Sequence, residues 1–243
     1  MRGFLALFNP KATEINGIVT YDDKLLKKRF DKFSCFDGKK ITEPQNASFK
    51  YVDKLDDNYN TFGKERNFTT SLGTTVKVSG GDYGWLVYST GEVKDLIVAI
   101  KGGQTITKVP RYTQTAASHN VNDIGNTYVE INITKQHLWF YKNGSLVADG
   151  DVVTGNVSIN DGTPTGVYKL KYKEKNATLK GEGYNVHVNE FMPFIHPATW
   201  RNKFGGSIYL KNGSHGCINS PPSLAKKIYD NIDANTPIIC YLQ

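Results

Sequence analysis

The chain has 243 residues, a net charge of +7 and a mean hydropathy of −0.44, which describes a globular protein large enough for one or two domains with real cores. No segment approaches the roughly 20 apolar residues of a membrane span, and the apolar run Phe4–Phe8 is too short for the core of a signal peptide. The charge is spread over both halves, so it does not favour a nucleic-acid-binding stripe. If the protein is exported, we expect its signal or anchor to lie outside this sequence.

The first half of the chain mixes helical and extended patterns. The expected elements are a helix over residues 22–33, strands within 68–88, a helix from 89 to 102 and an extended segment over 105–112. Ser89 and Glu92 have the spacing of a capping box, which predicts the start of the second helix. The polar run 113–120 then marks a domain boundary, with an α+β domain over 1–118 and a second domain over 119–243.

The second half is more uniformly β. The expected strands cover residues 128–134, 138–141, 146–147, 152–153, 166–172, 184–188 and 238–242. Asn143 and Gly144 are typical of a type I′ hairpin turn. Ser220 and Pro221 predict the start of a helix with Leu224 on its apolar side. These patterns together predict a mainly β domain.

The chain contains three cysteines, at positions 35, 217 and 240. Their spacing matches neither a disulfide framework nor a zinc ribbon, and a pair between Cys35 and Cys240 has no support in the sequence. Cys240 lies in the apolar run of the last expected strand, so we expect it to be buried. Cys217 is different because it lies in the segment SHGCIN, residues 214–219, among glycines and polar residues.

Cys217 is a candidate nucleophile. A thiol with a pKa of about 8.5 is mostly protonated at neutral pH, so its attack on an acyl carbon needs a base nearby. His215 and His196 are the two candidates for that base. Gly213 and Gly216 free the backbone around the cysteine, which lets successive N–H groups form an oxyanion hole.

Two other interpretations of Cys217 stay open at this point. A lone cysteine is more often an inert buried side chain than a catalyst. A zinc site could combine Cys217 with His187, His196 and His215, but the spacing lacks the close ligand pairs of structural zinc sites. We expect no catalytic role for the histidines on predicted strands or at the surface, His119, His137 and His187.

The segment from His196 through Asn219 resembles the signature of the L,D-transpeptidases, the cysteine enzymes of bacterial peptidoglycan cross-linking. Three further segments resemble the same family in the same order, residues 128–144, 154–155 and 163–166. The resemblance covers about residues 126–243 and implies a mainly β, sandwich-like catalytic domain. It also implies a role in cell wall synthesis and cell shape, with the protein outside the cytoplasm at the cell wall or cell surface.

The resemblance implies that Cys217 attacks the carbonyl of the third residue of a tetrapeptide stem and releases D-alanine. His196 takes the thiol proton and later deprotonates the side-chain amine of an acceptor stem, which converts the thioester into a cross-link. His215 and Gly216, with the cysteine itself, offer backbone N–H groups to the oxyanion. Ser214 and Asn219 hold the loop, although either could contact substrate.

Other expectations concern residues outside the hexapeptide. Trp200, Arg201 and Tyr184 are expected at the wall of the stem-peptide site. Pro197 follows His196 and offers neither a side-chain acceptor nor an N–H. The imidazole therefore has to be oriented by another group, such as a backbone carbonyl.

The same resemblance implies partners. Carbapenem-type β-lactams are expected to acylate Cys217, and no metal, cofactor or nucleic acid is expected to take part. The first 118 residues resemble the domain upstream of the catalytic unit in some Gram-positive members of the family, and we expect them to bind peptidoglycan or to act as a spacer. Two alternative functions remain: an L,D-carboxypeptidase with water as the acceptor, and a non-catalytic cell-wall-binding protein with an inert Cys217.

Overall fold

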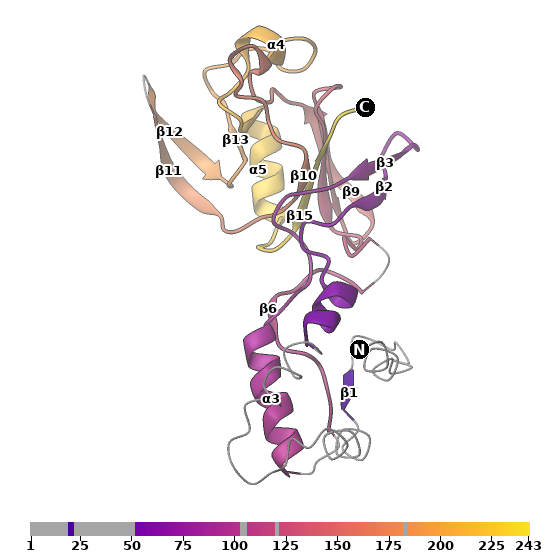
Figure 1. Cartoon of the computed structure of the whole chain (residues 1–243). Helices are drawn as coiled ribbons and strands as arrows, with labels where there is room; N and C mark the ends of the chain where they lie inside the picture. Colours follow the sequence, from indigo (N-terminus) through magenta and orange to yellow (C-terminus); the bar gives the residue numbers. More distant parts are fainter. Residues whose placement is uncertain (1–18, 22–51, 103–105, 120–121, 182–183) are drawn as a thin grey trace. The chain divides into compact units, whose positions relative to one another are not determined.

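The chain divides into two compact units. The computed structural model describes residues 19–21, 52–102, 106–119, 122–181 and 184–243 (Figure 1). One unit combines Met1–Thr61 with Trp85–Thr115, and the other combines Phe62–Gly84 with Ala116–Gln243. The step from Thr115 to Ala116 lies in the polar run of the predicted boundary, but Phe62–Gly84 groups with the C-terminal unit.

The N-terminal unit is α+β, as predicted. Its described elements are a helix over residues 52–59, β1 (Val19–Tyr21), β4 (Leu86–Val87), α3 (Ser89–Gly102), β5 (Ile106–Lys108) and β6 (Tyr112–Gln114). β1 pairs with β5 and β4 pairs with β6, both antiparallel. The predicted helix over 22–33 and Cys35 lie outside the described residues.

The predicted capping box at the start of α3 is wrong. The Ser89 hydroxyl donates to a carboxylate oxygen of Asp56 at 2.5 Å. Glu92 accepts from the backbone N–H of Arg111 and forms an ion pair with Lys108 at 3.0 Å. Tertiary contacts therefore use both side chains that the local pattern assigned to the helix end.

The C-terminal unit is mainly β, as predicted. Its strands are β2 (Arg66–Thr69), β3 (Thr75–Val78), β7 (Tyr128–Asn132), β8 (His137–Lys142), β9 (Ser145–Asp151), β10 (Gly166–Lys169), β11 (Glu174–Gly181), β12 (Tyr184–Phe191), β13 (Ile195–Pro197), β14 (Ile218–Ser220) and β15 (Pro237–Tyr241). Its helices are the short 3-10 helix η2 (Val157–Ile159), α4 (Tyr209–Asn212) and α5 (Pro222–Asn231). Five strands form one sheet in the order β10-β15-β7-β8-β9.

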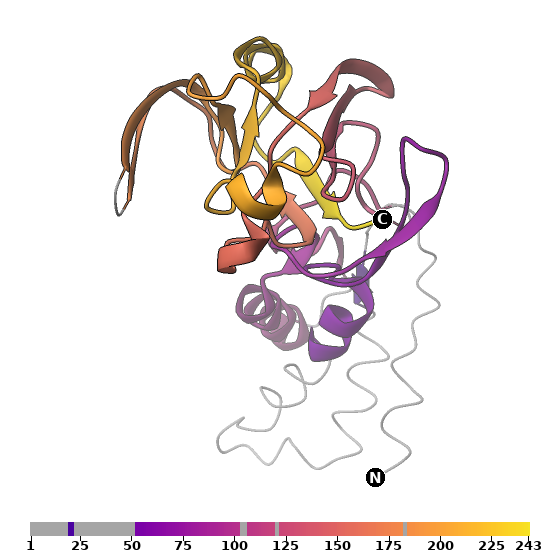
Figure 2. The ribbon, with the colours of Figure 1, turned by 90° about the horizontal axis from the view of Figure 1, so that it is seen from above.

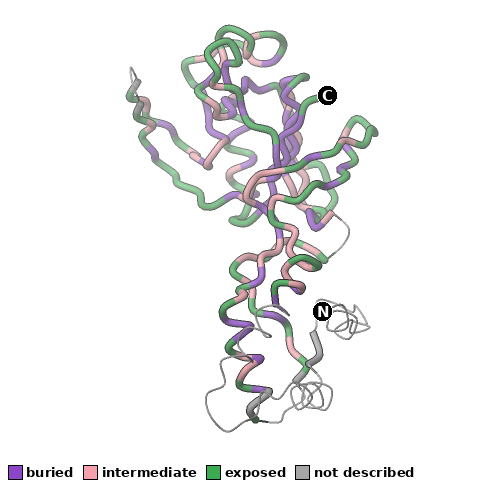
Figure 3. The backbone as a smooth tube through the Cα atoms, viewed as in Figure 1, coloured by how far each residue is buried: buried purple, intermediate pink, exposed green. Residues whose placement is uncertain are grey.

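Of the antiparallel hairpins in this unit, the sequence predicted β8–β9 well and β11–β12 poorly. The turn between β8 and β9 is type I′ as predicted, because Asn143 and Gly144 have positive φ angles of 52° and 78°. β11, which pairs antiparallel with β12, is not among the strands expected from the sequence. This second hairpin projects from the sheet and helix of its own unit (Figure 1, Figure 2), and residues 171–176 at its base are exposed (Figure 3). Such a polar strand has little hydrophobic periodicity to reveal it.

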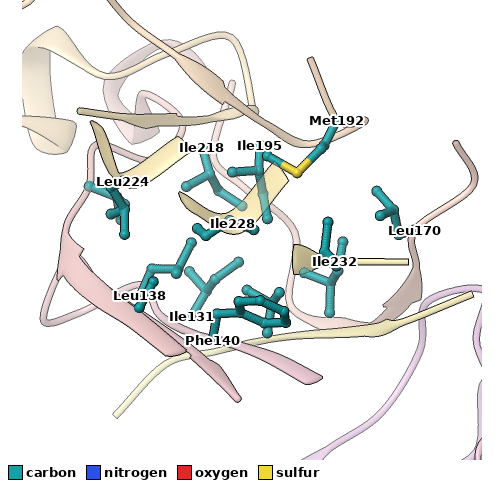
Figure 4. Close-up of a cluster of buried hydrophobic side chains, with 14 of the residues drawn as sticks. Ile131, Leu138, Phe140, Leu170, Met192, Ile195, Ile218, Leu224, Ile228 and Ile232 are labelled. Atoms are coloured by element: carbon teal, nitrogen blue, oxygen red, sulfur yellow. The ribbon is translucent and has the colours of Figure 1, made fainter. Parts of the chain in front are cut away.

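One face of the five-stranded sheet carries the main core of the unit. Alternate residues of β7, β8 and β15 point to this face because side chains alternate along a strand. α5 packs on it through Leu224 and Ile228, and Ile232 follows directly after the helix (Figure 4). Other buried side chains of this core are Val129, Ile131, Leu138, Phe140, Met192, Ile195, Ile218, Ile238 and Cys240. Cys240 is 1% exposed, which confirms the prediction of a buried cysteine.

The other face of the same sheet is covered by the β2–β3 hairpin. Ile239 and Tyr241 of β15 form a second core with Phe68 of β2, and β3 contacts β15 (Figure 2). The buried Glu130 of β7 accepts hydrogen bonds from the Ser71 N–H at 2.9 Å, the Ser71 hydroxyl at 2.5 Å and the Tyr241 hydroxyl at 2.7 Å. The hairpin is therefore one layer of the β-sandwich. Within the described residues, no helix is long and apolar enough to span a membrane.

Candidate active site

β13 and β14 form a short parallel ladder that contains His196 and begins directly after Cys217. Ile195 lies opposite Ile218, and His196 lies opposite Asn219. The side chains of Ile195 and Ile218 both belong to the main core (Figure 4). Successive side chains of a strand point to opposite faces, so His196 lies on the face that points away from the core. Cys217 directly precedes Ile218, in the bend that leads into β14. The ladder thus brings the segments around His196 and Cys217 side by side, although they are far apart in the sequence.

His196 is buried, with 3% of its surface exposed. Its Nδ1 lies 3.2 Å from the carbonyl oxygen of Pro197. A carbonyl oxygen only accepts, so Nδ1 carries the proton and Nε2 is left as the acceptor that a general base needs. Burial lowers the pKa of His196, and the hydrogen bond to Pro197 offsets part of this effect. The proline that lacks a side-chain acceptor thus orients the imidazole through its carbonyl.

Cys217 lies directly before β14 and is partly buried. The carbonyl of Cys217 accepts from the Ser214 hydroxyl, and the next N–H, that of Ile218, donates to the Phe194 carbonyl at 2.6 Å. Burial raises the pKa of the Cys217 thiol. Because burial also lowers the pKa of His196, both groups are neutral in the resting site at neutral pH. The thiol therefore has to pass its proton to the imidazole as it attacks.

The loop before Cys217 is fastened to the segment that follows β9. The Ser214 N–H donates to the Thr154 carbonyl at 2.9 Å, and the Asn156 N–H donates to the Ser214 carbonyl at 2.8 Å. The Asn156 side chain also donates to the Lys211 carbonyl at 3.1 Å. These bonds fix the backbone on the N-terminal side of the thiol.

The two glycines of this loop are needed for different reasons. Gly216 has a φ of +104°, in the region that favours glycine, as the sequence analysis anticipated. Gly213 instead has an extended backbone that any residue adopts, with a φ of −74° and a ψ of −171°. A Cβ at Gly213 would lie 2.5 Å from the backbone nitrogen of Asn156. Glycine is therefore required at position 213 for space and not for a special φ.

Arg201 fastens the same loop on its other side. Its Nε donates to the side-chain oxygen of Asn219 at 2.8 Å, and its terminal nitrogens donate to the carbonyls of Asn212 at 2.8 Å and Gly213 at 2.9 Å. Asn219 is 2% exposed and exchanges two backbone hydrogen bonds with Val153. The guanidinium thus binds the nucleophile loop, whereas the sequence predicts Arg201 at the wall of the stem-peptide site.

The other residues predicted for the site differ in how far they are exposed and described. His215 is exposed. Trp200 is 46% exposed, and its ring centroid lies 6.0 Å from that of His196. Tyr184 begins β12, but its side chain lies outside what the structure describes. Among the described residues, no group of three His, Cys, Asp or Glu side chains could hold a metal ion.

Thr163 contacts the nucleophile loop, although the sequence alone predicts no role for this residue. Its hydroxyl donates to the Gly216 carbonyl at 2.7 Å and accepts from the Gly155 N–H at 2.9 Å. Both Thr163 and Gly155 lie in segments that resemble the family in sequence, which was the only available signal. Phe191, whose ring stacks 6.3 Å from that of His196, was missed because nothing in its local sequence points to the histidine.

The chain is similar to known proteins in sequence and in fold. The family model of the YkuD L,D-transpeptidase catalytic domain matches residues 126–240. No curated protein matches the chain.

Two solved structures are similar over most of the chain. The Ldtfm–avibactam carbamoyl enzyme is 33% identical with a TM-score of 0.69, and the match covers 81% of this chain and 80% of that one. A cysteine-to-serine mutant of the Enterococcus faecium L,D-transpeptidase is 31% identical with a TM-score of 0.68, and the match covers 81% of this chain and 82% of that one. The similarity therefore extends beyond the segment that the family model matches.

Proposed function

The chain belongs to the L,D-transpeptidase family, and we propose that it cross-links peptidoglycan stems with Cys217 as the nucleophile and His196 as the general base. The observation that carries this proposal is the β13–β14 ladder. His196, whose imidazole has a free lone pair on Nε2, lies on one strand of this ladder, and Cys217 directly precedes the other strand, which supports the pairing of base and nucleophile. The substrate lies outside the cytoplasm, so we propose that the enzyme acts there.

The first half of the reaction is acylation of the cysteine. His196 Nε2 accepts the thiol proton while Sγ forms a bond to the carbonyl carbon of the third stem residue. The electron pair of the carbonyl moves to oxygen, where backbone N–H groups of the loop stabilise it. When the carbonyl re-forms, the bond to the terminal D-alanine breaks, and His196 gives its proton to the departing amine. The product is a thioester on Cys217 and free D-alanine.

The second half transfers the acyl group to an acceptor. The side-chain amine of the third residue of another stem attacks the thioester, and His196 accepts a proton from that amine. The C–S bond then breaks, and the sulfur regains its proton from His196. The result is an amide between two third residues and a free enzyme.

The test is product analysis with a disaccharide-tetrapeptide. Mass spectrometry is expected to find free D-alanine and a cross-linked dimer, and a Cys217→Ala variant serves as the blank. Tripeptide without dimer would identify an L,D-carboxypeptidase instead. An unchanged substrate would contradict both enzymatic functions and favour a wall-binding protein.

Inhibitors provide a simpler probe of the same thiol. The similar Ldtfm structure is a carbamoyl enzyme formed with avibactam, so we expect avibactam to carbamoylate Cys217 here and carbapenems to acylate it. Each would add one inhibitor mass to the wild type. Labelling that persisted in Cys217→Ala would assign the reaction to another residue.

The pKa of His196 predicts the acid limit of acylation. Burial holds this pKa below its ordinary value of about 6.5, and only the neutral imidazole accepts a proton. The rate constant for acylation by a carbapenem is therefore expected to stay constant as the pH falls to about 6.5 and to decrease only below it. The unfolded chain binds this proton more readily, so folding stability also decreases as the pH falls below about 6.5. The measurement is the time course of the mass shift at each pH. If lowering the pH halved the acylation rate before pH 7 was reached, this assignment would be contradicted.

A further inference from the structure

The hydroxyl of Thr163 joins two of the loops that form the site. It donates to the Gly216 carbonyl at 2.7 Å and accepts from the Gly155 N–H at 2.9 Å. Thr163 is 8% exposed, so water competes little for these bonds. Gly155 allows the close approach, because a Cβ there would lie 2.5 Å from the backbone nitrogen of Thr163. The position of the hydroxyl is thus fixed by contacts on both sides.

The Gly216 carbonyl belongs to the peptide bond that precedes Cys217. The described residues contain no cis peptide bond, and in a trans peptide the C=O and the N–H point in opposite directions. A carbonyl directed at Thr163 therefore directs the Cys217 N–H away from Thr163. The φ of +104° at Gly216 allows this orientation of the peptide plane.

The Cys217 N–H can serve as an oxyanion donor, because it is close to Sγ and has no other acceptor among the described residues. Among the described residues it donates to no backbone or side-chain acceptor, whereas the following N–H, of Ile218, is used by Phe194. The nitrogen and Sγ belong to the same residue, so an acyl group on Sγ carries its oxygen close to this N–H. Such a preorganised donor lowers the barrier only if its direction is held before the reaction begins.

We propose that Thr163 is a positioning residue for the oxyanion hole. Its hydroxyl holds the Gly216–Cys217 peptide so that the Cys217 N–H faces the oxygen that becomes negative when Sγ attacks. The proposal rests on the function proposed above, because it needs an acyl-transfer step. Thr163 itself forms no bond to substrate and exchanges no proton with it.

Two reactions of the same thiol separate this role from a general effect on the loop. Acylation by a carbapenem passes through an oxyanion, because Sγ adds to a carbonyl before the ring C–N bond breaks. Alkylation by iodoacetamide forms no oxyanion, because Sγ displaces iodide directly from a CH₂ group. Both reactions require removal of the thiol proton, so their ratio isolates the stabilisation of the oxyanion.

The experiment compares both rates in the full chain with Thr163→Val, which removes the hydroxyl and keeps the branched shape. Acylation is expected to slow about 100-fold, as for a lost oxyanion donor, while alkylation keeps the wild-type rate. Thr163→Ser restores the hydroxyl and is expected to recover most of the acylation rate. Thr165→Val is the matched control, because Thr165 is exposed on the same loop, and it is expected to leave both rates unchanged.

Two outcomes would overturn the proposal. Unchanged acylation in Thr163→Val would show that the hydroxyl does not hold the oxyanion donor. An equal decrease of both rates would show a displaced loop with no specific effect on the oxyanion. If thermal melting shows that Thr163→Val does not fold, Thr163→Ala is measured in the same two reactions. A wild type that is alkylated but never acylated would contradict the proposed function itself, and the role of Thr163 with it.

Discussion

Replacement of His196 by alanine is expected to slow acylation of Cys217 by a carbapenem about 10³-fold. Burial raises the pKa of the thiol, so at neutral pH the sulfur stays protonated until a base accepts its proton. The residual rate of the variant is expected to rise steadily with pH, because only thiolate formed by titration then reacts. The measurement is the time course of the mass shift at several pH values.

His215→Ala is the control for this prediction. His215 is exposed, and its predicted contribution is a backbone N–H that alanine retains. Its acylation rate is expected to remain within about tenfold of the wild type, since a full oxyanion donor contributes more than that. If His215→Ala lost activity while His196→Ala kept it, the role of general base would have to be transferred to His215.

Replacement of Glu130 by alanine is expected to lower the free energy of unfolding by about 3 kcal/mol. Glu130 is fully buried and accepts from Ser71 and Tyr241. Without the carboxylate, the Tyr241 hydroxyl and the Ser71 N–H lose their acceptor between the sheet and the β2–β3 hairpin, and a cavity remains. The measurement is the midpoint of denaturant unfolding.

Glu65→Ala is the matched control for Glu130→Ala. Glu65 precedes the same hairpin and pairs with Lys77 at 2.8 Å, but the two side chains are 55% and 69% exposed. An exposed ion pair of this kind contributes little to stability. Glu65→Ala is therefore expected to change the free energy of unfolding by less than about 0.5 kcal/mol. Equal shifts in the two variants would contradict the importance of the Glu130 network.

The Glu130 network also bears on the domain division. The polar run 113–120 is the clearest break in the sequence pattern, and it predicts one domain over residues 1–118. Ser71 and Glu130 are 59 positions apart, and Arg66 forms a buried ion pair with Asp123 at 2.6 Å. We therefore propose a catalytic domain of residues 119–243 completed by the hairpin from 62–84. Such contacts across a break in the pattern leave no local signal.

Local patterns determined much of the fold. The β8–β9 turn was predictable because Asn-Gly favours positive φ at both positions, and α5 because proline tolerates the first turn of a helix. The capping box failed for a related reason: its two side chains found tertiary partners in Asp56 and Arg111, which a pattern of neighbours does not contain.

The sequence by itself determined the family and the candidate pair Cys217 and His196. The reactivity of a thiol near histidines and glycines depends on residue type, which the sequence gives directly. Only the tertiary structure decided which side chains hold that pair in place. The Pro197 carbonyl orients the imidazole, Arg201 holds the loop from 18 positions away, and Thr163 reaches Gly216 from 53 positions away. Residue type says what a group can bond to, but the partner it finds depends on how the chain brings distant backbone atoms together.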